Sequence, residues 1–168
     1  MGPNKSLLLP HSFRTTWDGH FAREGRHDIK PWKPQEVLGK TAFEGDLQGV
    51  SVAANNGADV NKAAYDRDGS VGSTRTAAYL AAKKDRVDVL RFLLGDAGAD
   101  PNKGNTSNGW TPCHVACLHG NDGCVRVLLA GGADPDRATT DGNGDTPCVF
   151  AALYGHVACL RALREGSP

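Results

Sequence analysis

Residues 111–134 read TPCHVACLHGNDGCVRVLLAGGAD, with two short apolar segments separated by a glycine. Thr111 with Pro112, and likewise Thr146 with Pro147, are typical of a helix start. A threonine hydroxyl can accept from a free N–H group as a cap, and a proline at the first helical position leaves no N–H unpaired. Gly132 follows the second apolar segment, where a left-handed residue ends a helix with little strain. The stretch predicts a helix, a turn, a second helix and a loop.

The same pattern recurs along the chain. Thr76, Thr111 and Thr146 are spaced by 35 residues and open the segments TAAYLAA, TPCHVAC and TPCVFAA. A second apolar segment follows each one, and the motif Gly-Ala-Asp closes the units at Gly98 and Gly132. A more degenerate copy at 41–61 keeps the closing motif without the Thr-Pro opening. Helices this short are marginal alone, so such units must stack to bury their apolar faces.

These residues resemble the ankyrin repeat, whose pattern combines Thr-Pro-Leu-His, paired leucines and Gly-Ala-Asp at fixed spacings. The resemblance implies an all-α solenoid of helix-turn-helix units. We expect an irregular N-terminal arm over 1–35 and a repeat domain over 36–168. Within that domain the expected units are about 36–61, 76–102, 111–136 and 146–166, and the longer connection 62–75 is an inserted loop. The chain departs from the family pattern at Ala77, Tyr79, Asp85 and Val149, so these repeats should be less stable.

Composition excludes several classes of function. Of the 168 residues, 19 are Lys or Arg and 19 are Asp or Glu, so no net field attracts nucleic acid. No apolar run approaches the ~20 residues of a membrane span, and the stretch Leu7–Leu9 ends at Pro10. The first residues carry basic and hydroxyl side chains without acids, so organelle import stays open. The 5 cysteines cannot all pair within one chain, and a reducing, cytoplasmic location is expected.

The repeat register gives each cysteine a packing role. Cys113 and Cys148 take the place of a buried leucine in the family pattern, Cys117 takes an alanine place, and Cys124 and Cys159 take one apolar place in the second helices. Free cysteine packs as a small hydrophobe, so all five are expected to be buried and unreactive. A thiol enzyme would need an exposed, low-pKa cysteine beside a base, which this register does not offer.

Metal and cofactor sites are not expected. Zinc needs ligands that converge on one point, whereas Cys113 and Cys117 should face the core and His119 should face away. His114 occupies the family's histidine position, for which the resemblance implies a structural hydrogen bond near the Thr-Pro turn. The segments DRDGS at Asp66 and DGNGD at Asp141 begin like calcium loops but lack the later ligands, so they are read as turns. Arg91, Arg126 and Arg161 recur on the second helices and should solvate an outer helical face.

The resemblance implies that partners bind at the loop tips and at the exposed ends of the first helices. Trp110 is the first candidate, because a large exposed aromatic side chain is typical of interface hot spots. The other candidates in the repeats are Arg75, Lys83, Lys84, Ser107, Asn108, Leu118, His119, Asn143, Asp145, Leu153 and Tyr154.

The N-terminal arm holds four aromatic residues, Phe13, Trp17, Phe21 and Trp32, although a solvated tail is usually poor in aromatics. The spacing of the first three allows a helical stripe, and an extended arm with separate pockets is the alternative. Either version needs a surface that buries these rings. We expect the arm to dock into a larger assembly, for which cytoskeletal and ciliary complexes are examples.

The sequence therefore predicts a non-catalytic protein-interaction subunit without cofactors, small-molecule substrates or nucleic-acid partners. The main alternative is a soluble regulatory inhibitor that sequesters one signalling partner. A thiol enzyme and a zinc-binding protein are the remaining alternatives, and cysteine reactivity would distinguish them.

Overall fold

A computed structural model describes residues 33–62, 75–105 and 107–166. The chain divides into two units, 1–32 and 33–168, and everything below concerns the second. Its described residues form helices and connecting loops without a strand, which confirms the all-α prediction. The helices are α2 (Pro34–Glu44), α3 (Leu47–Asn55), α4 (Ala77–Lys83), α5 (Val87–Gly95), α6 (Pro112–His119), α7 (Asp122–Ala130), α8 (Pro147–Leu153) and α9 (Val157–Gly166).

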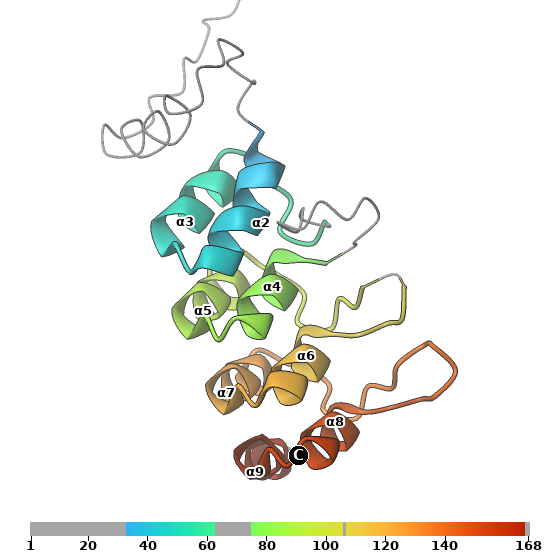
Figure 1. Cartoon of the computed structure of the whole chain (residues 1–168). Helices are drawn as coiled ribbons and strands as arrows, with labels where there is room; N and C mark the ends of the chain where they lie inside the picture. Colours follow the sequence, from blue (N-terminus) through green and yellow to red (C-terminus); the bar gives the residue numbers. More distant parts are fainter. Residues whose placement is uncertain (1–32, 63–74, 106, 167–168) are drawn as a thin grey trace, which may run out of the picture. The chain divides into compact units, whose positions relative to one another are not determined.

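The helices are arranged in four hairpins that stack in two layers (Figure 1). The first helices α2, α4, α6 and α8 form one layer, in which each packs against the next. The second helices α3, α5, α7 and α9 form the other layer in the same way. The connections before α6 and before α8 lie on the side of the first helices (Figure 1). Each hairpin therefore meets only its neighbours along the chain, as in other solenoids.

Small side chains allow the first helices to lie close together. Ala77, Ala78, Ala81 and Ala82 are four of the 7 residues of α4, and all four are at most 1% exposed. Leucines from the second layer, such as Leu90, fill the space between the layers and are fully buried. The core therefore runs along the whole stack, with a contribution from every hairpin.

Threonine side chains cap the starts of α4 and α6, but not the start of α8. The Thr76 hydroxyl accepts from the Tyr79 amide at 3.2 Å, and that of Thr111 accepts from the His114 amide at 3.5 Å. Thr146 has the same extended backbone, but its side chain makes no capping hydrogen bond. The prediction of a side-chain cap at Thr146 was therefore wrong. Val149 has no ring nitrogen to hold this threonine as His114 holds Thr111.

Left-handed residues mark the turns. Gly57, Gly98 and Gly132 have φ of 90, 70 and 87°, which confirms the role predicted for them at the helix ends. The turn between the two helices of each hairpin also needs a left-handed residue, and α4 and α5 meet at Asp85 with φ 56°. No other non-glycine residue among those described has positive φ.

Candidate protein-binding surface

The loop before α6 is held by its own hydrogen bonds. The Asn105 amide donates to the Trp110 carbonyl at 3.0 Å, and the Gly109 amide donates to the Asn105 carbonyl at 3.1 Å. The Asn105 side-chain oxygen also accepts from the Asn108 amide at 3.1 Å. The loop is thereby folded back on itself, and Ser107 is exposed at its tip.

The loop before α8 is closed around Thr139. This residue is buried, its amide donates to the Asp145 carbonyl at 2.9 Å, and its hydroxyl accepts from the Asp145 amide at 3.0 Å. The same hydroxyl donates to Asp141 at 2.8 Å. Hydrogen bonds from Thr139 and from the Asn143 amide lower the pKa of the Asp141 carboxyl. The segment DGNGD at 141–145 is thus an internally bonded turn, as the sequence predicted.

The two loops are joined to each other. The Thr140 amide donates to the Asn108 carbonyl at 2.9 Å. Gly109, with φ of 74°, lies so close that a Cβ there would be 2.6 Å from the Thr140 hydroxyl oxygen. Joined loops lose less conformational freedom when they bind a partner, so they form a pre-organised surface.

Trp110 packs against the following repeat. Its ring lies edge-on to Phe150, with 4.7 Å between centroids, and the residue is half-buried. The indole N–H is buried without an acceptor in hydrogen-bonding geometry, although Asp141 lies near enough for the indole to help lower the pKa of that carboxyl. The prediction that Trp110 is exposed was therefore wrong, because Phe150 of the next repeat reaches its ring. A role in binding stays a prediction.

His114 joins the α6 cap to the loop before α8. Its Nδ1 accepts from the Thr111 amide at 3.1 Å, and its Nε2 donates to the Asp145 carbonyl at 3.1 Å. Burial lowers the pKa of this histidine, and the ring is fully buried. The expected structural hydrogen bond near the Thr-Pro turn is confirmed.

Basic side chains gather at the ends of the first helices. Lys83 and Lys84 end α4, and His119 ends α6. Partial burial lowers the pKa of His119, and the positive charges of Lys83, Lys84 and His156 lower it further. We call these four residues the basic cluster. Lys84 also lies 4.6 Å from the centroid of the Phe43 ring, so the cluster extends toward the first hairpin.

The turn after each first helix is anchored to the hairpin before it. Asn121 donates its side-chain N–H to the Ala82 carbonyl at 2.8 Å, and His156 Nε2 lies 3.2 Å from the Leu118 carbonyl. Arg86 reaches the Phe43 carbonyl in the same way, at 3.4 Å. These contacts hold the helix ends that carry the basic cluster.

The structure sorts the remaining predicted residues by exposure. Exposed positions are Lys84, Ser107, His119, Asn143, Leu153 and Tyr154. Half-buried positions are Arg75, Lys83, Asn108, Leu118 and Asp145. Arg75 lies 5.8 Å from the centroid of the Tyr79 ring. The candidates Phe13, Trp17, Phe21 and Trp32, and all but Lys62 and Arg75 of the inserted loop, lie outside the described residues.

The cysteines divide into four buried thiols and one exposed thiol. Cys113, Cys117, Cys124 and Cys159 are fully buried, whereas Cys148 is exposed. Burial raises the pKa of Cys124 to about 12, and the nearby Asp85 carboxylate adds to the shift. The prediction that Cys148 is buried was wrong. Its counterpart Cys113 is covered by the next hairpin, and the described residues place no hairpin over Cys148.

No group of three histidine, cysteine, aspartate or glutamate side chains could hold a metal ion in the described parts of the chain. His119 is exposed at the end of α6, while Cys113 and Cys117 face the core. These residues therefore do not converge, in agreement with the sequence argument.

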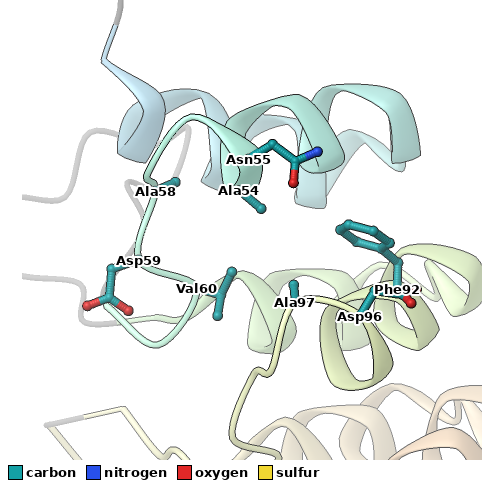
Figure 2. Close-up of a pocket in the computed structure, with 8 residues that line it drawn as sticks. All are labelled: Ala54, Asn55, Ala58, Asp59, Val60, Phe92, Asp96 and Ala97. Atoms are coloured by element: carbon teal, nitrogen blue, oxygen red, sulfur yellow. The ribbon is translucent and has the colours of Figure 1, made fainter.

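A groove of about 400 Å³ opens between α3 and α5 (Figure 2). Ala54 stands at the register position that Leu94 and Leu129 take in later hairpins, where these leucines lie against Gly131 and Gly166. The smaller alanine leaves that space open, and Figure 2 shows the Phe92 ring directed into it. Its lining contains no histidine, cysteine, serine or lysine, so it assembles no nucleophile and base.

The described residues thus form a repeat stack with joined loops and basic helix ends, and they contain no assembled catalytic site. The family model for ankyrin repeats matches residues 38–139 and 98–167, with 3 copies of the repeat. The chain belongs to the ankyrin-repeat family, whose repeats mediate binding between proteins.

Known relatives share segments of this chain. Human Rabankyrin-5 is 33% identical over 128 residues, which are 70% of this chain and 10% of that protein. The tyrosine-protein kinase HTK16 of Hydra vulgaris is 34% identical over 104 residues, or 59% of this chain and 13% of the kinase. The mitochondrial disaggregase of Bos taurus is 43% identical over 65 residues, 38% of this chain and 9% of that protein. The matched segments thus span at most about an eighth of these relatives, and what they share is the repeat region.

Within the residues that the structure describes, no helix combines the length and the apolar character that crossing a bilayer requires.

Proposed function

We propose that this chain is a non-catalytic interaction subunit that binds an acidic surface of a partner protein across its loop tips and first-helix ends. The observation that carries the proposal is the basic cluster Lys83, Lys84, His119 and His156. Burial lowers the pKa of His119, and the positive charges of Lys83 and Lys84 lie near enough to lower it further, so the end of α4 sets a positive potential at this surface. A partner carboxylate near the cluster would gain Coulomb energy from this potential.

The joined loops supply the second part of the proposed interface. Ser107 and Asn143 are exposed, and the amides of Asn108, Gly109 and Asn143 are already hydrogen-bonded within the loops. The two exposed side chains can therefore offer polar contacts with little ordering cost. Leu153 and Tyr154 add exposed apolar area at the end of α8. A surface with a basic centre and a mixed polar and apolar border matches the general composition of protein interfaces.

Cross-linking in the native source followed by mass spectrometry names the partner that this proposal requires. With that partner, the double change Lys83→Glu and Lys84→Glu should weaken binding at least tenfold, mainly through slower association at low salt. Arg91→Glu, an exposed basic position on α5 outside the cluster, is the matched control and should change binding little. Equal effects of the two changes would contradict a role for the basic cluster.

Replacing Trp110 distinguishes a role of this residue in folding from a role in binding. Because its ring is half-buried against Phe150, Trp110→Ala should cost about 2 kcal/mol of stability in addition to any loss of affinity. Ser107→Ala, at the exposed tip of the same loop, should leave stability unchanged. Binding that survives Trp110→Ala in a folded variant would assign the tryptophan to the fold alone.

We also propose that residues 1–32 dock the repeat stack into a larger assembly, cytoskeletal or ciliary complexes being examples. The support is the four aromatic residues Phe13, Trp17, Phe21 and Trp32, whose burial needs a surface. Deleting residues 1–32, which end before α2, should abolish incorporation into the complex while the repeats stay folded. Unchanged incorporation would rule out the docking role.

The alternative is a cytoplasmic inhibitor that sequesters one signalling partner. It predicts exchange between free and bound forms, whereas an assembly subunit stays with its complex during gel filtration of the native material. Migration of the native protein as a free monomer would favour the inhibitor.

A further inference from the structure

The groove between α3 and α5 lies where the repeat pattern changes. In the next interface of the second layer, Leu94 lies against Gly131, and the equivalent leucine and glycine meet again in the interface after that. The same register brings Ala54 opposite Asp96, and both residues line the groove. The leucine that fills this space elsewhere is therefore absent, and a carboxylate stands where the later hairpins have a glycine.

The turn after α5 also departs from the pattern. The Ala99 amide donates to the Leu93 carbonyl, six residues earlier in the chain. In the next hairpin the Ala133 amide donates to the Leu128 carbonyl, which is five residues earlier. The turn after α5 is thus one residue longer, and Ala97 of this turn lines the groove. Because the groove lies between two stacked hairpins, it is not an end of the stack.

The charge of the groove is negative. Asp59 and Asp96 are both exposed and line it, and the described lining contains no lysine, arginine or histidine. Neither carboxylate forms an ion pair within 4.0 Å among the described residues. α3 and α5 also end at this groove, and the carbonyl groups at a helix C-terminus favour a cation. These charges favour a basic occupant.

Phe92 supplies an aromatic surface beside one of the carboxylates. It lies one helical turn before Asp96, so both side chains project from the same side of α5, and the ring is directed into the groove (Figure 2). The same register position holds only Val52, Val127 and Ala162 in the other hairpins. A guanidinium group stacks on an aromatic face and forms paired hydrogen bonds with a carboxylate, whereas an ammonium group is a compact point charge. The pair of ring and carboxylate therefore fits an arginine better than a lysine.

We infer that this groove binds a short basic segment of a partner protein, with an arginine side chain stacked on Phe92 and paired with Asp96. A second basic side chain of the segment lies against Asp59. The two carboxylates are at opposite ends of the groove in Figure 2, so two basic residues are needed to meet both. Between them, the small side chains of Ala54 and Ala97 leave room for the backbone of the segment. The basic cluster attracts the opposite charge, so the two surfaces can be tested independently.

Three synthetic peptides test the groove. Each has two variable positions separated by small residues, and these are filled by arginine, by lysine or by citrulline, the neutral counterpart of arginine. By fluorescence anisotropy, the full chain should bind the arginine peptide at least five times more tightly than the citrulline peptide and at least twice as tightly as the lysine peptide. The double change Asp59→Asn and Asp96→Asn should weaken binding of the arginine peptide at least fivefold. Asp88→Asn, an exposed position on α5 outside the groove, is the matched control and should leave binding unchanged.

Two further variants test the shape of the groove and the role of the ring. Ala54→Leu restores the leucine of the later interfaces and fills the groove, so it should abolish binding while circular dichroism stays that of the unchanged protein. Phe92→Leu removes the ring, so the preference for arginine over lysine should disappear.

Several outcomes would overturn the inference. Equal binding of the arginine and citrulline peptides would do so, as would unchanged binding after the double asparagine change, which decides the question even if Ala54→Leu fails to fold. Dimerisation in sedimentation that Ala54→Leu abolishes would make a second copy the occupant. Tighter peptide binding after deletion of residues 1–32 would make a segment of the chain itself the occupant.

Discussion

At the scale of single residues, His114 shows how one side chain can connect two repeats. Its ring nitrogens contact the α6 cap on one side and the Asp145 carbonyl of the next loop on the other. A neutral ring satisfies both contacts, because Nδ1 must accept and Nε2 must donate. A protonated ring would lose the first contact and carry a charge into a fully buried place.

This arrangement predicts a pH-dependent stability. The pKa of His114 in the folded chain lies below its ordinary value of about 6.5, so the unfolded chain takes up the proton first as pH falls. The stability that the neutral His114 ring contributes is fully present above about pH 7. Below about pH 6.5 it declines by up to about 1.4 kcal/mol per pH unit, until the folded ring also titrates.

Urea unfolding of the unchanged protein and of His114→Asn at pH 7.5 and 5.5 measures this effect. The stability difference between the two proteins should shrink at the lower pH, since asparagine does not titrate. Val149→Ala, at the same register position of the next repeat, is the control, because neither side chain titrates. A difference that is the same at both pH values would contradict the linkage.

Asp85 has a strained left-handed backbone conformation, and a glycine at this position should relieve the strain. The equivalent turns use Gly45, Gly120 and Gly155, whereas Asp85 adopts a φ of 56° with a side chain attached. We expect Asp85→Gly to raise the free energy of unfolding by about 0.5–1 kcal/mol, since relief of strain outweighs the greater freedom of glycine in the unfolded chain. Asp85→Asn should be nearly neutral in the same denaturation series. A loss of stability in the glycine variant would show that the 3.5 Å contact from the Cys124 thiol to Asp85 matters more.

At the scale of elements, side-chain amides link successive closing turns. Asn61 donates to the Gly98 carbonyl and accepts from the Asp100 amide, and Asn102 repeats both contacts with Gly132 and Asp134. Gln35 bridges to Asp59 in the same manner. Each bridge satisfies backbone groups of the following turn, so it sets the spacing between hairpins as well as adding stability.

Removal of one bridge has a defined cost. Asn102→Ala removes the hydrogen bonds at 3.0 Å to the Gly132 carbonyl and at 2.8 Å from the Asp134 amide, and should lower stability by about 1–2 kcal/mol. Asp136 occupies the same register position in the next turn, and its side chain makes no such bridge in the described part of the chain. Asp136→Ala should therefore change the thermal midpoint little. Equal shifts for the two variants would mean that the bridge contributes nothing.

At the scale of the whole repeat stack, stability depends on how many neighbours a hairpin has. Among the described helices, α7 packs against α5, α6 and α9, whereas the main neighbours of α9 are α7 and α8. In a solenoid the free energy is close to a sum of repeat and interface contributions, so a hairpin with one interface opens more easily. The single ion pair between Arg126 and Glu165 is exposed and adds little to this interface.

Hydrogen exchange followed by mass spectrometry should reveal this gradient. In the isolated chain, amides of α9 should exchange faster than those of α7, although both helices carry a strongly apolar face. α5 and α7 both have neighbours on two sides and serve as internal controls. Protection of α9 equal to that of α7 would show that the stack unfolds as one cooperative unit.

Much of the fold could be predicted from particular residues. The threonines at a fixed spacing located three of the four hairpins, and Gly57, Gly98 and Gly132 located the closing turns. These signals are local, since a helix start or a left-handed turn depends on residues within one hairpin. The hydrogen bonds of His114 were anticipated only through the family resemblance, because the Asp145 carbonyl lies in the next hairpin.

The candidate surface could be predicted less well. The sequence named candidate residues in each loop separately, but the hydrogen bond from Thr140 to Asn108 and the basic cluster had no pattern in the sequence. Lys83, Lys84, His119 and His156 come from three hairpins, and only the stacking distance brings them together. Comparing the residues at the same register position in successive repeats could have identified this cluster from the sequence.

The amino-acid order alone therefore specified the repeat, the helix starts after Thr76, Thr111 and Thr146, and the closing turns, because these depend on interactions over a few residues. Exposure was decided by the tertiary structure. Cys113 and Cys148 share one register position, yet one is buried and the other is open, and Trp110 is half-covered by Phe150 of the following repeat. The physical reason is that burial depends on what packs above a residue, and in a stack that is the next hairpin.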